Sequence, residues 1–139
     1  MAFSGYLIKI GGSGGTELPM TYMKAESYKA TPSQRMEVKA ARDATGVLHR
    51  NTVEHTATKI EFETPPMTNR DVATLMGLFR SNWSNENERR LDIEYYNEEE
   101  DDYITADVHI PDIQYPIYRI DLATNTVYYN PIRIAFIEY

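Results

Sequence analysis

The chain contains no cysteine and a single tryptophan. The lack of cysteine excludes disulfide bonds, a thiolate nucleophile and a cysteine-ligated zinc site, so the fold must be held by packing and hydrogen bonds. No apolar run approaches the roughly 20 residues that a membrane-spanning helix needs. Residues 1–5 lack the charged start and the long apolar stretch of a signal peptide. We therefore expect synthesis in the cytoplasm and no direct membrane insertion.

Basic residues are in the minority, with 14 Lys and Arg against 21 Asp and Glu and a net charge of −7. Because surfaces that bind nucleic-acid phosphates depend on Lys and Arg, we expect no specific nucleic-acid binding. The 139 residues, 42% of them hydrophobic, suffice for one core and are too few for two, which predicts a single domain over residues 1–139. The 11 tyrosines favour strands and protein interfaces.

Three features of the sequence suggest catalysis or metal binding, but each lacks the neighbouring residues that such a site needs. Residues Gly11–Gly15 match the Gly-x-Ser-x-Gly pattern of a hydrolase, but no helical pattern follows Ser13 to fix a nucleophile, so we predict a flexible turn. The three histidines are scattered, and the acidic run Glu98–Asp102 lacks the ligand spacing of a calcium loop. We expect no enzymatic activity, no metal and no cofactor.

Hydrophobic periodicity predicts the elements of the first half. Residues Phe3–Ile10 alternate as a strand, and after the glycines Tyr22–Ala30 is expected to return beside it as a hairpin. A half-buried strand is predicted over Thr56–Glu63. Apolar residues then recur at helical spacing, and Thr68 with Asp71 resembles a capping box, which predicts a helix over about Asn69–Asn82.

The second half is predicted to consist of strands. One passes through Leu91 and Tyr95, and a second has Ile104, Ala106, Val108 and Ile110 on one face. Others are expected near Gln114–Ile120 and over Thr126–Tyr139, with a break at Pro131. The predicted fold class is mainly β (α+β): a β-sandwich or barrel with one packed helix and a long projecting arm.

The arm is residues 31–53, a polar and charged stretch with turn residues at Asp43–Gly46. Its few apolar residues cannot build a core, so we expect another molecule to stabilise it. Trp83, just after the predicted helix, suits either a cover over the core or an interface anchor. The candidate subunit-interface residues are Arg35, Val38, Arg42, Val47, Leu48, Arg50, Trp83, Tyr103 and Tyr128.

The sequence resembles an uncharacterised family of small bacteriophage and prophage tail proteins from Gram-positive bacteria, and its element order is similar to that of tail-tube and distal-tail proteins. The resemblance rests on residues 1–10 followed by glycines, and on Met23–Tyr28, Arg42–Asp43, Gly46–Arg50, Lys59–Phe62, Glu94–Tyr96 and Tyr129–Arg133. It implies a virion protein near the tail tip, with a β-sandwich or barrel, one helix and an arm that reaches the neighbouring subunit.

The resemblance leads to a functional hypothesis. We expect a structural subunit that forms a ring with itself, sixfold by the resemblance, as an adaptor at the distal tail or baseplate. There it would join the tail tube to the baseplate hub near the tape-measure protein, and DNA would pass through the lumen. Two alternatives stay open: a tail-tube or tail-completion subunit, and a small ligand- or carbohydrate-binding β-module with tyrosines along a groove.

Overall fold

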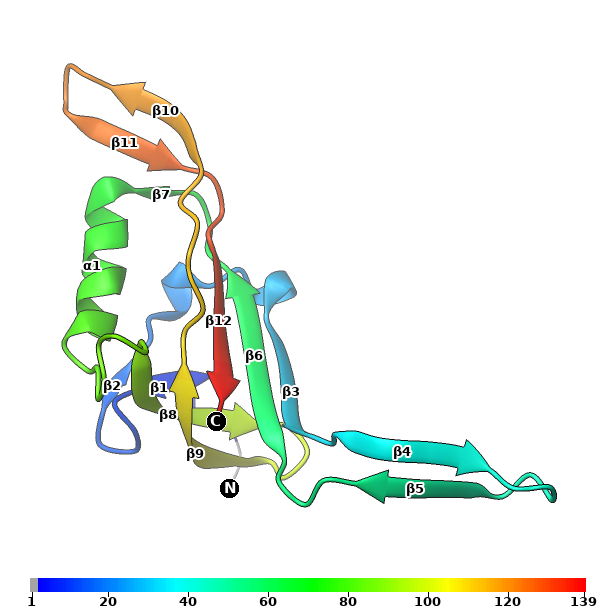
Figure 1. Cartoon of the computed structure of the whole chain (residues 1–139). Coiled ribbons are helices and arrows are strands. Elements are labelled where there is room, and N and C mark those ends of the chain that lie inside the picture. The colour runs from blue at the N-terminus through cyan, green and yellow to red at the C-terminus, as the bar shows by residue number, and fades with distance from the viewer. Residues whose placement is uncertain (1–2) are drawn as a thin grey trace.

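The computed structural model describes residues 3–139, which are mainly β with one α-helix (Figure 1). The strands are β1 Ile8–Ile10, β2 Thr16–Glu17, β3 Lys29–Gln34, β4 Glu37–Arg42, β5 Leu48–Thr52, β6 Ala57–Glu63, β7 Met67–Thr68, β8 Arg90–Asn97, β9 Asp102–His109, β10 Ile117–Asp121, β11 Thr126–Tyr129 and β12 Arg133–Glu138. The helices are the α-helix α1 Asn69–Arg80 and the 3₁₀ turns η1 Met20–Tyr22 and η2 Ala25–Ser27. The predicted fold class is confirmed.

Seven antiparallel strands form the main sheet in the order β2-β1-β8-β9-β12-β6-β3. Strand β9 pairs with β8 along its whole length but with β12 only through Val108 and His109. The sheet turns a corner at this junction, and β8 runs across β12 and β6 in Figure 1. Because β2 and β3 are the two edges, the sheet is an open, sandwich-like layer rather than a closed barrel.

The core lies between the two halves of the main sheet and α1. Ile8, Ile93, Ile60 and Phe136 are fully buried, so both halves contribute to one hydrophobic cluster. The predicted alternation is confirmed in β6, and in β9 Ala106 and Val108 are buried while Ile104 is partly buried. In β12 the burial does not alternate, because Ala135 is buried together with Ile134 and Phe136. Such burial contributes about 25 cal/mol per Å² of apolar surface, which makes this cluster the main source of stability.

Helix α1 begins where the sequence predicts and ends two residues earlier. Thr68 Oγ1 accepts a hydrogen bond from the Asp71 amide, and the Asp71 carboxylate accepts one from the Thr68 amide, so the capping box is confirmed. Leu75 and Phe79 are buried against the sheet. The helix ends at Arg80, and the side chain of Asn82 satisfies a carbonyl of its last turn by donating to Leu78 over 2.8 Å.

The N-terminal expectations are wrong in two respects. The first strand does not extend over Phe3–Ile10 but begins at Ile8, after Gly5 adopts a left-handed φ of 94°. Residues 22–30 do not return beside it, because β2 occupies that place. The chain instead forms η1 and η2, and β3 then pairs with β6. The amide of Lys24 donates to the Glu63 carbonyl over 2.9 Å, which fixes this segment beside β6 rather than β1.

Two pieces of β structure extend beyond the main sheet (Figure 1). The hairpin β4–β5 projects from one end, and the small sheet β10-β11-β7 extends beyond α1 at the other. The arm is shorter than the predicted 31–53, because residues 31–34 belong to β3. Likewise, the strand expected near Gln114 begins at Ile117, since Pro116 has no amide to donate.

The glycine segment is a tight structural turn between β1 and β2. Gly11 and Gly12 have φ angles of 100° and 85°, and the Gly15 amide donates to the Gly12 carbonyl over 3.0 Å. A Cβ on Gly15 would lie 2.0 Å from the Ile10 carbonyl oxygen, whereas one on Gly14 would meet no atom within 4 Å. Ser13 is therefore followed by a turn and a strand, not by the helix of a nucleophile elbow.

We predict that Gly15→Ala destabilises the protein by at least about 1 kcal/mol, because the new methyl group displaces the backbone of β1. Gly14→Ala is the matched control and should change the free energy of unfolding by less than about 0.5 kcal/mol. Urea denaturation followed by circular dichroism measures both values. Equal effects of the two substitutions would contradict the tight turn.

Candidate subunit interface

The arm, defined from here on as residues 35–53, is exposed to solvent along its length. Every residue of β4 and β5 is exposed, including Val38, of whose surface 67% is accessible, and Leu48. Met36 and Val47 are exposed as well. A two-stranded hairpin with no third layer is marginally stable in water. The arm is thus an extended surface whose apolar side chains have no cover within the subunit.

The pairing of β4 with β5 places predicted interface residues together. Arg42 pairs with Leu48 and Ala40 with Arg50, so Arg42, Leu48 and Arg50 share one face of the hairpin. Arg50 forms an ion pair with Glu37 on that face. Val38 lies where the register shifts between Glu37 and Lys39, which interrupts the alternation. Of the remaining arm candidates, Val47 lies beside the turn and Arg35 bonds the Ser33 carbonyl at the base.

The tip of the arm is ordered by Asp43. Its Oδ1 accepts hydrogen bonds from the Thr45 hydroxyl, the Thr45 amide and the Val47 amide, at 2.7, 2.9 and 3.1 Å. Its Oδ2 lies 2.9 Å from His49 Nε2. The Thr45 hydroxyl, followed by His49, lowers the pKa of Asp43 to about 2. Local polar contacts therefore shape an arm that has no core of its own.

The arm differs in charge from the rest of the chain. Residues 35–53 carry four cationic side chains, Arg35, Lys39, Arg42 and Arg50, and two acidic ones, Glu37 and Asp43. The net charge of the arm is therefore +2. Since the net charge of the whole chain is −7, the residues outside the arm have a net charge of −9. A basic arm on an acidic subunit is attracted to acidic surfaces, including that of another copy.

The small sheet, β7, β10 and β11, exposes apolar side chains that the sequence analysis did not single out. Ile117 and Ile120 are more than half exposed, as is Tyr118, and 82% of Leu122 is accessible. Strand β10 is the edge of this sheet, with backbone groups available on its outer side. The signal in the sequence was the pair of charged residues, Arg119 and Asp121, within this short strand, since charged residues are rarely buried.

Tyr128 lies on this sheet, as one of the predicted interface residues. The Arg119 guanidinium is 4.3 Å from the centre of the Tyr128 ring, and the Tyr118 ring centre is 6.0 Å away. Arg119 pairs with Tyr128 in the register, so these side chains form one face. Ile117 pairs with Tyr129 and Ile120 with Val127 on the opposite face.

The other two aromatic candidates are engaged within the subunit. Trp83 packs on Phe79 at 6.4 Å and is partly buried at the edge of the core, as the cover that the sequence suggested. Tyr103 stacks on Tyr6 at 4.4 Å, and its hydroxyl donates to the Tyr6 carbonyl over 2.7 Å. Their additional role in subunit contacts stays a prediction.

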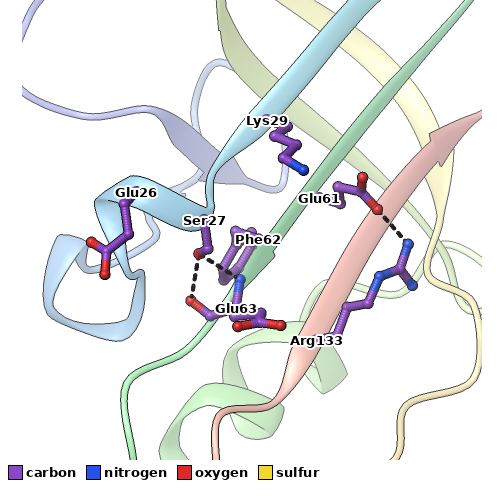
Figure 2. Close-up of a pocket in the computed structure, with 7 residues that line it drawn as sticks. All are labelled: Glu26, Ser27, Lys29, Glu61, Phe62, Glu63 and Arg133. Carbon is purple, nitrogen blue, oxygen red and sulfur yellow. Dashed lines mark hydrogen bonds and ion pairs between the residues drawn. The ribbon is translucent and has the colours of Figure 1, made fainter.

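A hollow of about 250 Å³ lies at the outer face of the main sheet (Figure 2). Glu61 is ion-paired with Arg133, which lowers the pKa of Glu61. The Ser27 hydroxyl donates to the Lys24 carbonyl over 2.6 Å and accepts from the Glu63 amide over 2.9 Å. These contacts fasten η2 to β6 and connect adjacent strands, which favours a structural role for the hollow.

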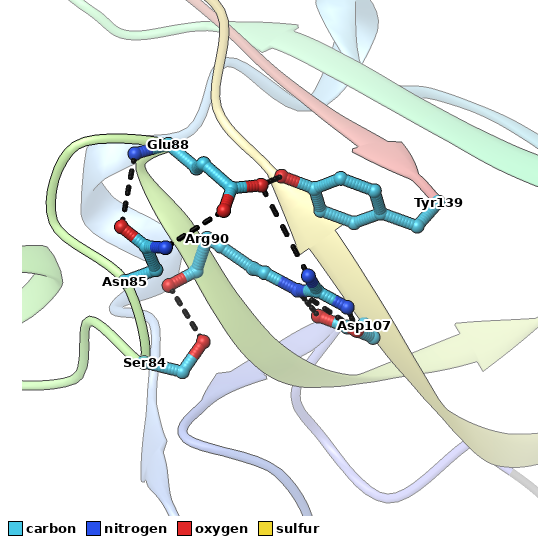
Figure 3. Close-up of polar contacts among 6 residues, drawn as sticks. All are labelled: Ser84, Asn85, Glu88, Arg90, Asp107 and Tyr139. Atoms are coloured by element: carbon cyan, nitrogen blue, oxygen red, sulfur yellow. Dashed lines mark hydrogen bonds and ion pairs between the residues drawn. The ribbon is translucent and has the colours of Figure 1, made fainter.

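A second polar cluster fastens the loop before β8 (Figure 3). Arg90 Nε donates to both carboxylate oxygens of Asp107 at 3.0 Å, and this contact lowers the pKa of Asp107. The Arg90 guanidinium lies 4.1 Å from the centre of the Tyr139 ring, whose hydroxyl donates to Glu88 over 2.8 Å. The cluster connects β8, β9 and the end of β12.

Two of the three histidines contact the same residue, Tyr139. His55 Nε2 is 2.7 Å from the Tyr139 carbonyl oxygen, and the centre of the His109 ring is 5.3 Å from that of the Tyr139 ring. His49 lies apart from them, in the arm. Within residues 3–139, no three His, Asp or Glu side chains are grouped as metal ligands. In the same range, no helix is long and apolar enough to cross a membrane.

Comparison with known proteins gives one family match. The chain matches, over residues 1–139, the model of a family described as "Family of unknown function (DUF6711)". No curated protein matches the sequence, and no solved structure matches the fold.

We predict that Asp43 titrates with a pKa of about 2 and that Thr45→Ala raises this value toward 3.8, because the strongest hydrogen bond is lost. Since the folded pKa is depressed, the contribution of Asp43 to arm order is complete above about pH 4 and is lost as the pH falls through about 2. Carboxyl chemical shifts in an NMR titration measure both values. Thr45→Ser, which keeps the hydroxyl that donates to Asp43, is the matched control and should leave the pKa near 2. A normal pKa for Asp43 would contradict the turn.

Proposed function

The chain belongs to DUF6711, and we propose that it is a structural, non-enzymatic subunit of a bacteriophage tail that assembles with copies of itself into a ring. Its station would be the distal tail or baseplate of the virion, as an adaptor between tail tube and hub near the tape-measure protein. The phage assignment is supported by the sequence resemblance. The self-assembly is supported by the arm.

The single observation that carries the proposal is that the arm is ordered but uncovered. All residues of β4 and β5 are exposed, and the main core contains none of them. Exposed apolar groups on a projecting hairpin are typical of surfaces that become buried in an assembly. A second copy is a suitable partner because the rest of the chain is acidic while the arm is basic.

The remaining architecture suits a ring subunit. The main sheet and α1 form one core that holds the arm at a fixed place, and the small sheet offers a second surface at the other end (Figure 1). A ring requires two different contact surfaces on each subunit, because every copy must contact a neighbour on either side. A net charge of −7 also suits a wall past which DNA moves without binding.

Two other functions are distinguishable by experiment. A tail-tube subunit would be present in many copies per particle, whereas an adaptor ring would contribute about six. Quantitative mass spectrometry of purified particles measures the number of copies per particle.

A carbohydrate-binding module is the alternative of another class, favoured by the exposed Tyr118 and the adjacent Tyr128. Glycan binding by a monomer would support it.

We predict that the purified protein self-associates and that Leu48→Asp weakens this association at least tenfold, because a carboxylate replaces an apolar contact. Ser13→Asp makes the same charge change in an exposed turn away from the arm and should leave association unchanged. Native mass spectrometry and negative-stain imaging measure the oligomer. A protein that stays monomeric at high concentration and is missing from tail particles would overturn the proposed function.

A further inference from the structure

Two uncovered apolar surfaces lie on the same chain, and the subunit cannot bring them together. One is the arm, with Val38 and Leu48, and the other is the small sheet, with Ile117, Ile120 and Leu122. Figure 1 shows them at opposite ends of the molecule, separated by the main sheet and α1. Any contact between the two is therefore a contact between different copies.

We propose that the small sheet of one copy is the docking surface for the arm of the next copy. This inference rests on the proposed function and adds to it the receiving surface and the head-to-tail direction of assembly. An interface of this kind is heterologous, because two different patches meet, and repetition of one rotation closes it into a ring.

The chemistry of the two surfaces is complementary. The arm brings Arg42 and Arg50 beside Leu48 on one face, and the small sheet brings exposed aromatic and aliphatic side chains. Ile117 and Ile120 lie on the face of the small sheet opposite to Tyr128, where Leu48 and the aliphatic stems of Arg42 and Arg50 of the next copy would pack. The net charge of +2 on the arm against −9 on the rest of a neighbouring copy draws the arm toward that copy.

The backbone of the two surfaces is complementary as well. Strand β10 is the edge of the small sheet, and both strands of the arm have an outer edge, because the hairpin is a sheet of two strands. Open edges pair with extended segments of other chains, and a five-residue strand such as β10 is matched by the five residues of β5. An edge strand that exposes Ile117 and Ile120 is an aggregation hazard unless a specific partner covers it.

A complementation experiment tests the inference. Leu48→Asp damages the arm, and Ile120→Asp damages the small sheet, and each variant alone should lose association at least tenfold. An equimolar mixture restores one intact arm facing one intact small sheet, so we expect one-to-one heterodimers by native mass spectrometry and no larger rings. The exposed positions keep both variants folded, which thermal unfolding checks.

Cross-linking provides a second readout, because the natural chain has no cysteine. Leu48→Cys mixed with Ile120→Cys should form a disulfide-linked heterodimer under mild oxidation, and the double variant should form a ladder that ends in a closed ring. Leu48→Cys mixed with Ser13→Cys is the control and should not cross-link above background.

The outcomes separate this inference from the proposed function. If the natural protein stays monomeric, both fail. If it forms rings but the mixture of Asp variants stays monomeric and the cysteines do not cross-link, the ring uses another surface, and the docking of the arm on the small sheet is wrong. Cross-linking between two arms would likewise overturn it.

Discussion

The junction between β9 and β12 is the constraint on which the rest of the structure depends. One half of the main sheet is β2-β1-β8-β9, and the other is β12-β6-β3. The two halves are joined by two residue pairs, Val108 with Glu138 and His109 with Ile137. The sheet turns at this point, so the apolar faces of β8 and β6 meet around one core. A direct contact across that core is the hydrogen bond of 3.0 Å between the buried hydroxyls of Thr58 and Tyr95. Without the corner, the two faces would need two separate cores, for which the chain is too short.

A core placed in this way uses the apolar residues of the main sheet and α1 and leaves the two projections uncovered. Strands β4 and β5 continue from β3 and β6 beyond the edge of the core, so their side chains have solvent on both faces. The small sheet keeps Met67 and Tyr129 in contact with the core while β10 extends past it. Because the core stabilises the main sheet and α1 alone, the arm and most of the small sheet are left as surfaces that a partner can cover.

Local signals in the sequence predict much of this fold. The alternation of Ile60 and Phe62 and the capping pair Thr68 and Asp71 each act within a few residues, and both are confirmed. The 3₁₀ turns before β3 were not predicted, because the bond of Lys24 to Glu63 joins positions far apart in the sequence.

The sequence likewise predicts some features of the candidate interface and misses others. Alternation places Leu48 and Arg50 on one face of the arm, whereas the shift of register beside Val38 has no sequence signature. The exposure of Ile120 was not predicted, although the charged Arg119 and Asp121 on either side of it are typical of an exposed strand.

In the proposed head-to-tail assembly, the arm and the small sheet would favour a closed ring over an open chain. In any open chain of copies, one arm and one small sheet stay uncovered at the ends, and closure of the ring buries both. The charge distribution also favours this contact. The residues outside the arm are acidic, so two copies repel one another unless the basic arm of one lies between them. The proposed head-to-tail contact would gain both apolar burial and charge attraction, whereas a contact between two acidic main sheets would gain neither.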